Sequence, residues 1–182
     1  MEFILLSAAQ KALYRSQLLD VMRICDKDFV PPLSARHSTS DTAFTHKTVC
    51  ENGITAYLDD MLAHHVLAAV EDGALLGFVA FKTDYAHGPI TADALPNLYI
   101  CTLMLAPAAR GRGLAAQMYT HLFNELYPQT DLYTRTWSTN GAHLKILSRF
   151  GFSVMARIEN DRGNGIDTVY LCKKRNDPAG GV

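Results

Sequence analysis

The sequence predicts a single domain of α/β type, in the α+β sense of a mixed sheet covered by helices. Its 182 residues suit one hydrophobic core, and a composition of 48% hydrophobic and 19% charged residues is ordinary for a globular protein. Short apolar runs typical of strands follow one another in places and elsewhere alternate with segments of helical spacing. We expect one domain over residues 1–175 and a flexible tail at residues 176–182.

The first third of the chain predicts a strand and two helices. Phe3–Leu6 is a short apolar run, as expected of a buried strand, and helical spacing follows over Ala8–Cys25. Residues 26–53 have no period and are rich in Pro, Ser, Thr and His, and a long irregular segment in a compact domain usually has a function. Helical spacing returns over Ile54–Ala63. The apolar stripe expected on the first helix consists of Leu13, Leu18, Leu19, Met22 and Ile24.

The middle of the chain predicts three strands. Val66–Val70 and Ala74–Phe81 are apolar runs on either side of an Asp-Gly turn, a pattern typical of a β-hairpin. Thr83–Asn97 contains Gly88 and two prolines and indicates a loop. The next apolar run, Leu98–Leu105, predicts the third strand.

The remaining elements alternate and then end in a strand pair. Apolar residues at intervals of four predict a helix over Gly113–Leu126, and Leu132–Trp137 reads as a strand. A helix is expected over Asn140–Phe150. Ser153–Ile158 and Thr168–Lys173 predict two final strands around a turn-rich connection.

Composition also restricts the class of function. The net charge of −1 gives no indication of a nucleic-acid partner or of an anionic membrane surface. The start of the chain has no basic region, and its apolar run is too short for a signal peptide. The four cysteines lack metal-site spacing, and we expect reduced thiols in a cytoplasmic protein without a metal.

A glycine-rich segment follows the strand at Leu98–Leu105. Pro107 stops further pairing, and Arg110–Ala116 then leads into a helix. Glycines allow backbone amides to approach a ligand, and the first N–H groups of a helix have no internal partner. The segment therefore predicts an anion site that combines these amides with two arginine side chains.

Two sequence blocks resemble the GNAT acetyltransferase superfamily. Arg110, Gly113 and Ala115 match its pyrophosphate motif, Gln/Arg-x-x-Gly-x-Gly/Ala, which follows an apolar strand and a proline. Asn140, followed eleven residues later by Gly151-Phe152, resembles the family's Asn-led helix, although Asn is also a common helix N-cap. The resemblance covers residues 98–152 and implies a mostly antiparallel mixed sheet with splayed central strands, flanked by helices.

The resemblance implies direct transfer of an acetyl group from acetyl-coenzyme A (acetyl-CoA), as cosubstrate, to a primary amine of a small molecule or protein. The backbone of Leu103 would donate to the thioester oxygen as negative charge develops on it. Many family members form homodimers, and the sequence leaves the oligomeric state open. The positions expected to bind the cosubstrate are Leu103, Met104, Leu105, Arg110, Gly111, Arg112, Gly113, Leu114, Ala115, Ala116, Asn140, His143 and Leu147.

The catalytic side chains depart from the family pattern. Leu147 stands where many members have an acidic Tyr, and no Glu occupies the strand position that often supplies the base. The replacement candidates are His143, Tyr99, Tyr133 and Ser148, of which His143 lies one helical turn before Leu147. An alternative hypothesis is that positioning and the backbone oxyanion site carry most of the catalysis.

Other functions remain open at this point. Gly111-x-Gly113-x-x-Ala116 also fits a dinucleotide-binding pattern, but five residues separate its first glycine from the strand, and Asp131 precedes its strand instead of following one. A CoA-binding sensor or interaction module and an N-acyltransferase for longer acyl chains are further alternatives. The acceptor is expected where the segments Asp28–Gly53 and Thr83–Asn97 meet the splayed strands. These segments contain Phe29, Arg36, His37, His46, Tyr85 and His87.

Overall fold

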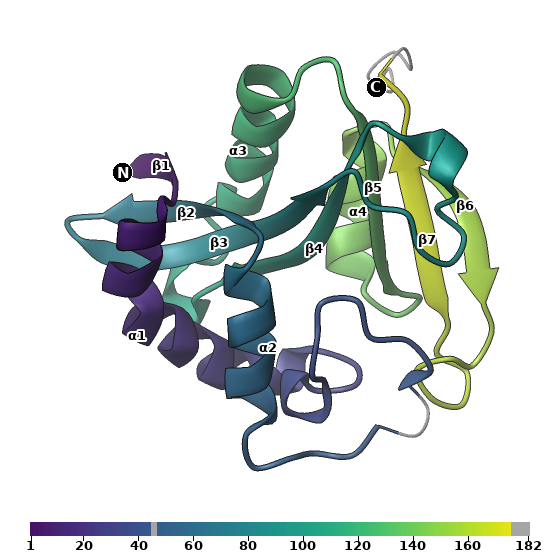
Figure 1. The fold of residues 1–182 in the computed structure, drawn as a ribbon, viewed down its shortest axis with the longest axis horizontal. Coiled ribbons are helices and arrows are strands. Elements are labelled where there is room, and N and C mark those ends of the chain that lie inside the picture. Colours follow the sequence, from purple (N-terminus) through teal and green to yellow (C-terminus); the bar gives the residue numbers. More distant parts are fainter. Residues whose placement is uncertain (45–46, 176–182) are drawn as a thin grey trace.

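The computed structural model describes residues 1–44 and 47–175, and the expected tail at residues 176–182 lies outside them. This part of the chain forms seven strands and four α-helices (Figure 1). In chain order they are β1 (Glu2–Leu5), α1 (Ala8–Cys25), α2 (Gly53–Leu62), β2 (His65–Glu71), β3 (Ala74–Thr83), β4 (Asn97–Leu105), α3 (Leu114–Thr120), β5 (Asp131–Trp137), α4 (Gly141–Arg149), β6 (Ser153–Ile158) and β7 (Thr168–Lys173).

The strands form one mixed sheet in the order β1-β2-β3-β4-β5-β7-β6. Every neighbouring pair is antiparallel except β4 and β5, which are parallel. The α3 helix lies in the connection between these two strands, as a parallel crossover requires. The predicted fold class, a mostly antiparallel mixed sheet flanked by helices, is confirmed.

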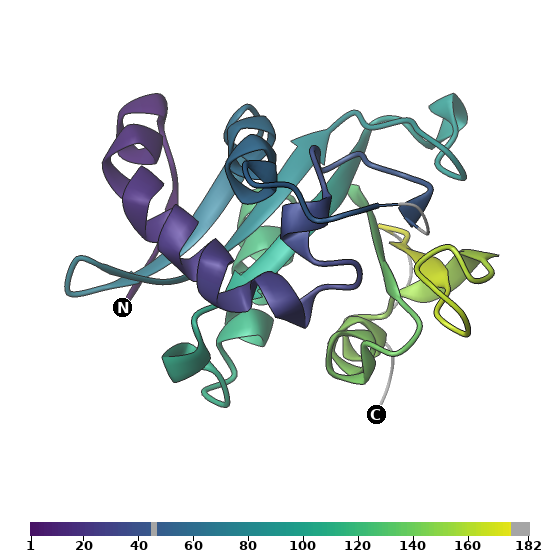
Figure 2. The ribbon, with the colours of Figure 1, turned by 90° about the horizontal axis from the view of Figure 1, so that it is seen from below.

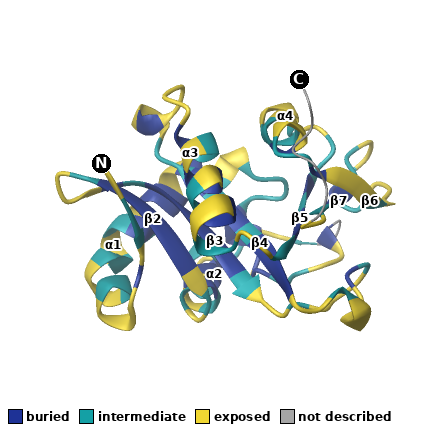
Figure 3. Cartoon of the chain, turned by 90° about the horizontal axis from the view of Figure 1, so that it is seen from above, coloured by how far each residue is buried: buried dark blue, intermediate teal, exposed yellow. Residues whose placement is uncertain are grey.

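Helices cover both faces of the sheet. Leu18 and Met22 of α1 and Leu58 of α2 pack on one face. Leu114 of α3 and Leu147 of α4 belong to the core on the other face. Figure 2 shows the two pairs of helices on opposite sides of the sheet, and Figure 3 shows β2, β3 and β4 buried between them. No helix in the described part of the chain is long and apolar enough to span a membrane.

The β4 and β5 strands separate partway along their length. Their pairing runs from Asn97 opposite Asp131 to Ile100 opposite Thr134 and then ends, although both strands continue (Figure 1). The β3–β4 register passes over Cys101, because Ala80 pairs with Thr102 and Phe81 with Ile100. Such a bulge bends and twists a strand, and here it lies where the two strands part. The expected splay of the central strands is therefore present.

Two helices differ in detail from the expectation. The α1 bounds agree, and a reciprocal capping box between Ser7 and Gln10 explains its start. However, Leu13 and Ile24 are 71% and 64% exposed, so their place in the apolar stripe was wrong. The expected helix over 113–126 is α3 followed directly by a π-helical segment, His121–Leu126.

Candidate active site

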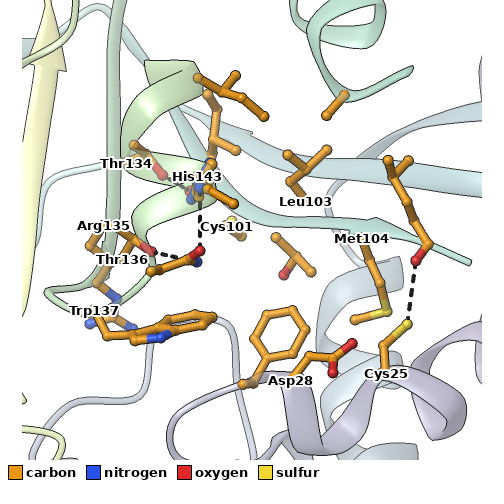
Figure 4. A pocket seen from close by; sticks show the side chains of 18 of the residues that line it. Cys25, Asp28, Cys101, Leu103, Met104, Thr134, Arg135, Thr136, Trp137 and His143 are labelled. Carbon is orange, nitrogen blue, oxygen red and sulfur yellow. Dashed lines mark hydrogen bonds between the residues drawn. The ribbon is translucent and has the colours of Figure 1, made fainter. Parts of the chain in front are cut away.

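A cavity of about 310 Å³ opens where β4 and β5 separate. Both strands line it, together with α4, the start of the glycine-rich segment and residues 25–39. In Figure 4, Leu103 and His143 lie on one side of the cavity, and Cys25, Asp28 and Trp137 lie on the opposite side. The cavity therefore connects elements from the two faces of the sheet.

Alternation along β5 separates two groups of lining residues. Thr136 faces α4, where it accepts a hydrogen bond from Asn140 Nδ2 at 3.1 Å. Arg135 and Trp137 contact the irregular segment between α1 and α2: Arg135 donates to the carbonyl of Thr39 at 3.4 Å, and the Trp137 ring lies 5.7 Å from that of Phe29. One side of β5 thus faces α4 and the other faces the irregular segment.

The glycine-rich segment places a row of amides beside the cavity. Gly111 and Gly113 have φ angles of 74° and 72°, in the left-handed region that favours glycine. Within the described residues, the backbone N–H groups from Gly111 to Ala115 donate to no other protein group. They are therefore available to an anion, and the segment leads directly into the positive end of α3.

Both arginines of this segment are already ion-paired. Arg110 Nη2 lies 2.6 Å from Asp28 Oδ2 and 3.2 Å from the Cys25 sulfur, and the hydrogen bond to Asp28 raises the pKa of Arg110. Arg112 pairs with Glu71 at 3.2 Å. Both pairs are largely exposed, so each is weak and can exchange its partner for a bound anion.

A polar network begins at the first residues of α4. Asn140 caps the helix by accepting a hydrogen bond from the His143 amide at 3.3 Å, so its expected N-cap role is present. His143 Nε2 lies 2.7 Å from the hydroxyl of Tyr119 on α3. Burial lowers the pKa of His143 from 6.5 to about 4. The neutral form of the imidazole, with one donor and one acceptor nitrogen, is therefore favoured at pH 7.

The structure brings most residues of the two family-like blocks together. Those that line the cavity are Leu103, Met104, Leu105, Arg110, Ala115, Asn140 and His143. Gly111, Arg112, Gly113, Leu114 and Ala116 belong to the adjoining turn and helix start. Leu147 is fully buried in the core and does not line the cavity.

Tyr99 and Tyr133 lie away from the cavity. They form a separate buried cluster with Ile90 and Tyr170, at the end of the sheet where β4 and β5 are still paired. The Tyr133 hydroxyl accepts a hydrogen bond from Lys174 Nζ at 2.5 Å, and burial strongly raises the pKa of Tyr99. Ser148 is exposed and also lies outside the lining.

The expected acceptor segments contribute unequally. Phe29 and Arg36 line the cavity, whereas the described residues of Thr83–Asn97 do not. Tyr85 stacks on Tyr99 at 4.1 Å, His37 and His87 are absent from the lining, and His46 lies outside the described residues. Sequence reasoning did not single out several residues at or behind the cavity, which are scattered along the chain; they include Tyr119, Arg135, Trp137 and Arg162.

The comparisons agree with this architecture. An N-acetyltransferase from Staphylococcus aureus superposes with a TM-score of 0.63 at 17% identity, covering 97% of this chain and 100% of that one. A ribosomal-protein-alanine N-acetyltransferase from Brucella melitensis gives 0.63 at 14% identity, with 96% and 99% covered. An aminoglycoside 6'-N-acetyltransferase complexed with coenzyme A gives 0.67 at 12% identity, with 99% and 100% covered.

Structural likeness at these identities shows the fold alone, and no curated protein sequence matches the chain. The family model described as the acetyltransferase (GNAT) family, however, matches residues 29–152. This region contains the separated strands, the glycine-rich segment and α4. The chain therefore belongs to the GNAT acetyltransferase family.

Proposed function

We propose that this protein transfers an acetyl group from acetyl-CoA directly to a primary amine of a small molecule or protein. The observation that carries the proposal is the separation of β4 and β5 beyond Ile100 and Thr134. It opens a cavity that adjoins the glycine-rich segment and reaches Trp137 and the irregular segment. Two substrates that enter from different sides can meet in such a cavity without a covalent enzyme intermediate.

The residues present fit coenzyme A. The free amides from Gly111 to Ala115 and the side chains of Arg110 and Arg112 supply donors for a pyrophosphate. Asn140 and His143 lie beside the gap between the strands, where an extended pantetheine arm would pass.

We assign stabilisation of the developing oxyanion to the backbone N–H of Leu103. Beyond Ile100 the β5-facing edge of β4 has no strand partner, so its N–H groups are available to a ligand. One well-placed donor of this kind contributes about 2.7–4 kcal/mol to transition-state stabilisation. Because the donor belongs to the backbone, the family role does not depend on the leucine side chain.

Proton transfer has few candidates in the cavity. Asp28 is the one acidic side chain among the described lining residues, and Arg110 holds it in an ion pair. His143, as a neutral imidazole, suits donation of a hydrogen bond to the leaving thiolate better than removal of a proton from the amine. We therefore infer that substrate positioning and the backbone donor contribute most of the rate, and that water carries the amine proton away.

The direct test measures thiol release from acetyl-CoA across a panel of amines, with mass spectrometry of the acetylated product. Trp137, the single tryptophan, lines the cavity and gives a fluorescence signal for binding. If acetyl-CoA neither binds nor reacts with any amine, the proposal is wrong.

A second candidate is a CoA-binding sensor or interaction module without turnover. The buried Leu147 at the usual acid position favours it. Tight binding of acetyl-CoA without product on any amine would support this candidate over catalysis. An N-acyltransferase that prefers a longer acyl chain is distinguished by competition between acyl-CoA compounds of increasing chain length.

A further inference from the structure

Three arginines converge at the side of the cavity that faces the irregular segment. Arg36 and Arg162 are 7% and 6% exposed, and Arg135 is partly buried. Their guanidinium carbons lie 5.1, 4.4 and 5.1 Å from the ring centre of Phe44 for Arg36, Arg162 and Arg135 respectively. All three arginines also line the cavity. Three positive charges are thus grouped around one aromatic ring at one side of the candidate site.

None of the three forms a salt bridge with a carboxylate of the described residues. Two acids are nearby, but each is engaged elsewhere. Asp41 pairs with Lys47 at 3.0 Å, and Asp161 accepts a hydrogen bond from Thr168 Oγ1 at 2.5 Å. Burial, followed by repulsion from the other two arginines, lowers the pKa of Arg162 to about 9. Within the described residues the cluster therefore carries three positive charges and no direct ion pair, and Asp41 and Asp161 act on Arg36 and Arg162 only through space.

The protein satisfies these arginines mostly with neutral oxygens. Arg36 and Arg162 donate to the backbone carbonyl of Val30, and Arg135 donates to the carbonyls of Thr39 and Asp41. These bonds hold the irregular segment against β5. They account for the position of the side chains but add no negative charge, since a carbonyl has no net charge.

Each guanidinium also keeps a nitrogen that has no acceptor within the described residues. These are Nη1 of Arg36, Nε of Arg135 and Nη2 of Arg162. Among described residues, the one fully buried side-chain nitrogen or oxygen without a partner is His64 Nε2, so the three arginine nitrogens retain accessible surface. The group therefore has donors available to a ligand.

The cluster lies on the acceptor side of the sheet. Arg135 projects from β5 on the side opposite Thr136, and Thr136 bonds Asn140 of α4. The donors assigned to coenzyme A lie with α4 and the glycine-rich segment. The arginines are therefore separated from the pyrophosphate site by the strand and by the cavity between.

We propose that the acceptor is a small amine that also carries an oxyanion, carboxylate or phosphate, and that this group binds among Arg36, Arg135 and Arg162. The proposal rests on the proposed acetyl transfer, because it assigns the substrate class of the same cavity. Guanidinium groups bind both oxyanions through paired hydrogen bonds. The oxyanion would supply the missing negative charge and direct the amine toward the gap between the strands.

Binding of reaction products tests the idea without turnover. The probes are N-acetyl amino acids against the corresponding N-acetyl amino acid amides, and N-acetyl-O-phosphoethanolamine against N-acetylethanolamine, followed by Trp137 fluorescence. We expect at least one of these anionic compounds to bind tenfold or more tightly than the neutral compound with which it is paired. Equal binding of every acid and its neutral partner overturns the proposal. Comparison of the amino-acid pairs with the phosphoethanolamine pair shows whether the site prefers a carboxylate or a phosphate.

Variants then assign the preference to the cluster. Arg162→Gln is expected to remove most of the preference for the acid over the amide. Arg162→Lys keeps the positive charge but loses the planar guanidinium, so it is expected to retain part of that preference. Arg149→Gln, on the exposed side of α4, should leave the preference unchanged. If Arg162→Gln unfolds the protein, the wild-type comparison of acids and amides still decides the question.

The two proposals fail in different ways. Absence of acetyl-CoA binding refutes the acetyltransferase function itself. Binding of acetyl-CoA with transfer to neutral or cationic amines, but no preference for anionic ones, refutes only the assignment of the arginine cluster. In that case the arginines serve to hold the irregular segment through its carbonyls.

Discussion

The Tyr119 hydroxyl of α3 lies 2.7 Å from Nε2 of His143 on α4. Leu147, the usual tyrosine position of the family, is one turn further along α4 and fully buried. A tyrosine hydroxyl is therefore present next to the α4 helix, but it comes from another helix and reaches the cavity only through His143. Tyr119 thus positions the His143 imidazole at the cavity, and burial favours the neutral form of the ring by lowering its pKa.

We expect both members of this pair to contribute little to the chemical step. His143→Ala should retain most of kcat, with a loss below a hundredfold, because water can protonate a thiolate. Tyr119→Phe should lower the free energy of unfolding by about 1–2 kcal/mol, since it removes the partner of a buried nitrogen. Steady-state kinetics and urea unfolding measure both effects. A loss of kcat beyond a hundredfold in His143→Ala would show that the imidazole is an essential acid or base.

The stability of the protein should fall as the pH is lowered from 6.5 toward 4. Burial lowers the pKa of His143 to about 4, so the unfolded chain takes up a proton in this range while the folded protein does not. At pH 5 the resulting loss is about 2 kcal/mol relative to pH 7.5. Burial also lowers the pKa of His64, which adds a loss of the same sign.

Urea unfolding at pH 7.5 and pH 5 separates the contribution of His143. The difference between the two pH values should be about 2 kcal/mol smaller in His143→Gln than in the wild type. The same substitution at exposed His37, which lies outside the cavity lining, is the control for loss of an imidazole. An equal pH dependence in wild type and His143→Gln would mean that the imidazole is protonated in the folded state.

Local pattern was sufficient to predict the sheet and the two sequence blocks that adjoin the cavity. The apolar runs of β6 and β7 and the spacing of α1 agree in both bounds with the structure. The two family-like blocks meet at one cavity because a strand, a glycine-rich turn and a helix are consecutive in the chain. Short-range chemistry of this kind is encoded in adjacent residues and can be recognised without the fold.

The acceptor side could not be predicted in the same way. Arg36, Arg135 and Arg162 are far apart in the chain, and each has the ordinary appearance of a surface charge. Their convergence on Phe44 depends on the path of the irregular segment across β5. Likewise, Tyr119 resembles a core aromatic of α3, and only the packing of α3 against α4 brings it to His143.

Gly113→Ala should weaken acetyl-CoA binding as well as stability. Its φ of 72° is strained for any residue with a Cβ, at a cost of about 1–2 kcal/mol. Relaxation of the turn would reorient the free amides, and we expect the KM for acetyl-CoA to rise about tenfold. Gly73→Ala is the matched control, because Gly73 has a φ of 78° in the β2–β3 turn, away from the cavity. An equal rise of KM in both variants would exclude a specific role of the Gly113 turn.

The ion pair between Arg110 and Asp28 should compete with coenzyme A for the arginine. At 46% and 51% side-chain exposure the pair contributes about 0.2–1 kcal/mol, so Asp28→Asn should lower the Kd of coenzyme A about two- to fivefold. Arg110→Ala should raise it about tenfold. Calorimetric titration with coenzyme A measures both.

Asp59→Asn provides the matched control for this ion pair. It breaks the exposed pair of Arg15 and Asp59, which has the same 2.6 Å separation and lies outside the cavity lining. The Kd should not change in this variant. In Asp28→Asn, Arg110 keeps its contacts with the Cys25 sulfur and the Leu105 carbonyl, so the side chain stays beside the glycine-rich segment. A higher Kd in Asp28→Asn would instead mean that the carboxylate positions Arg110 for binding, and that the pair persists in the complex.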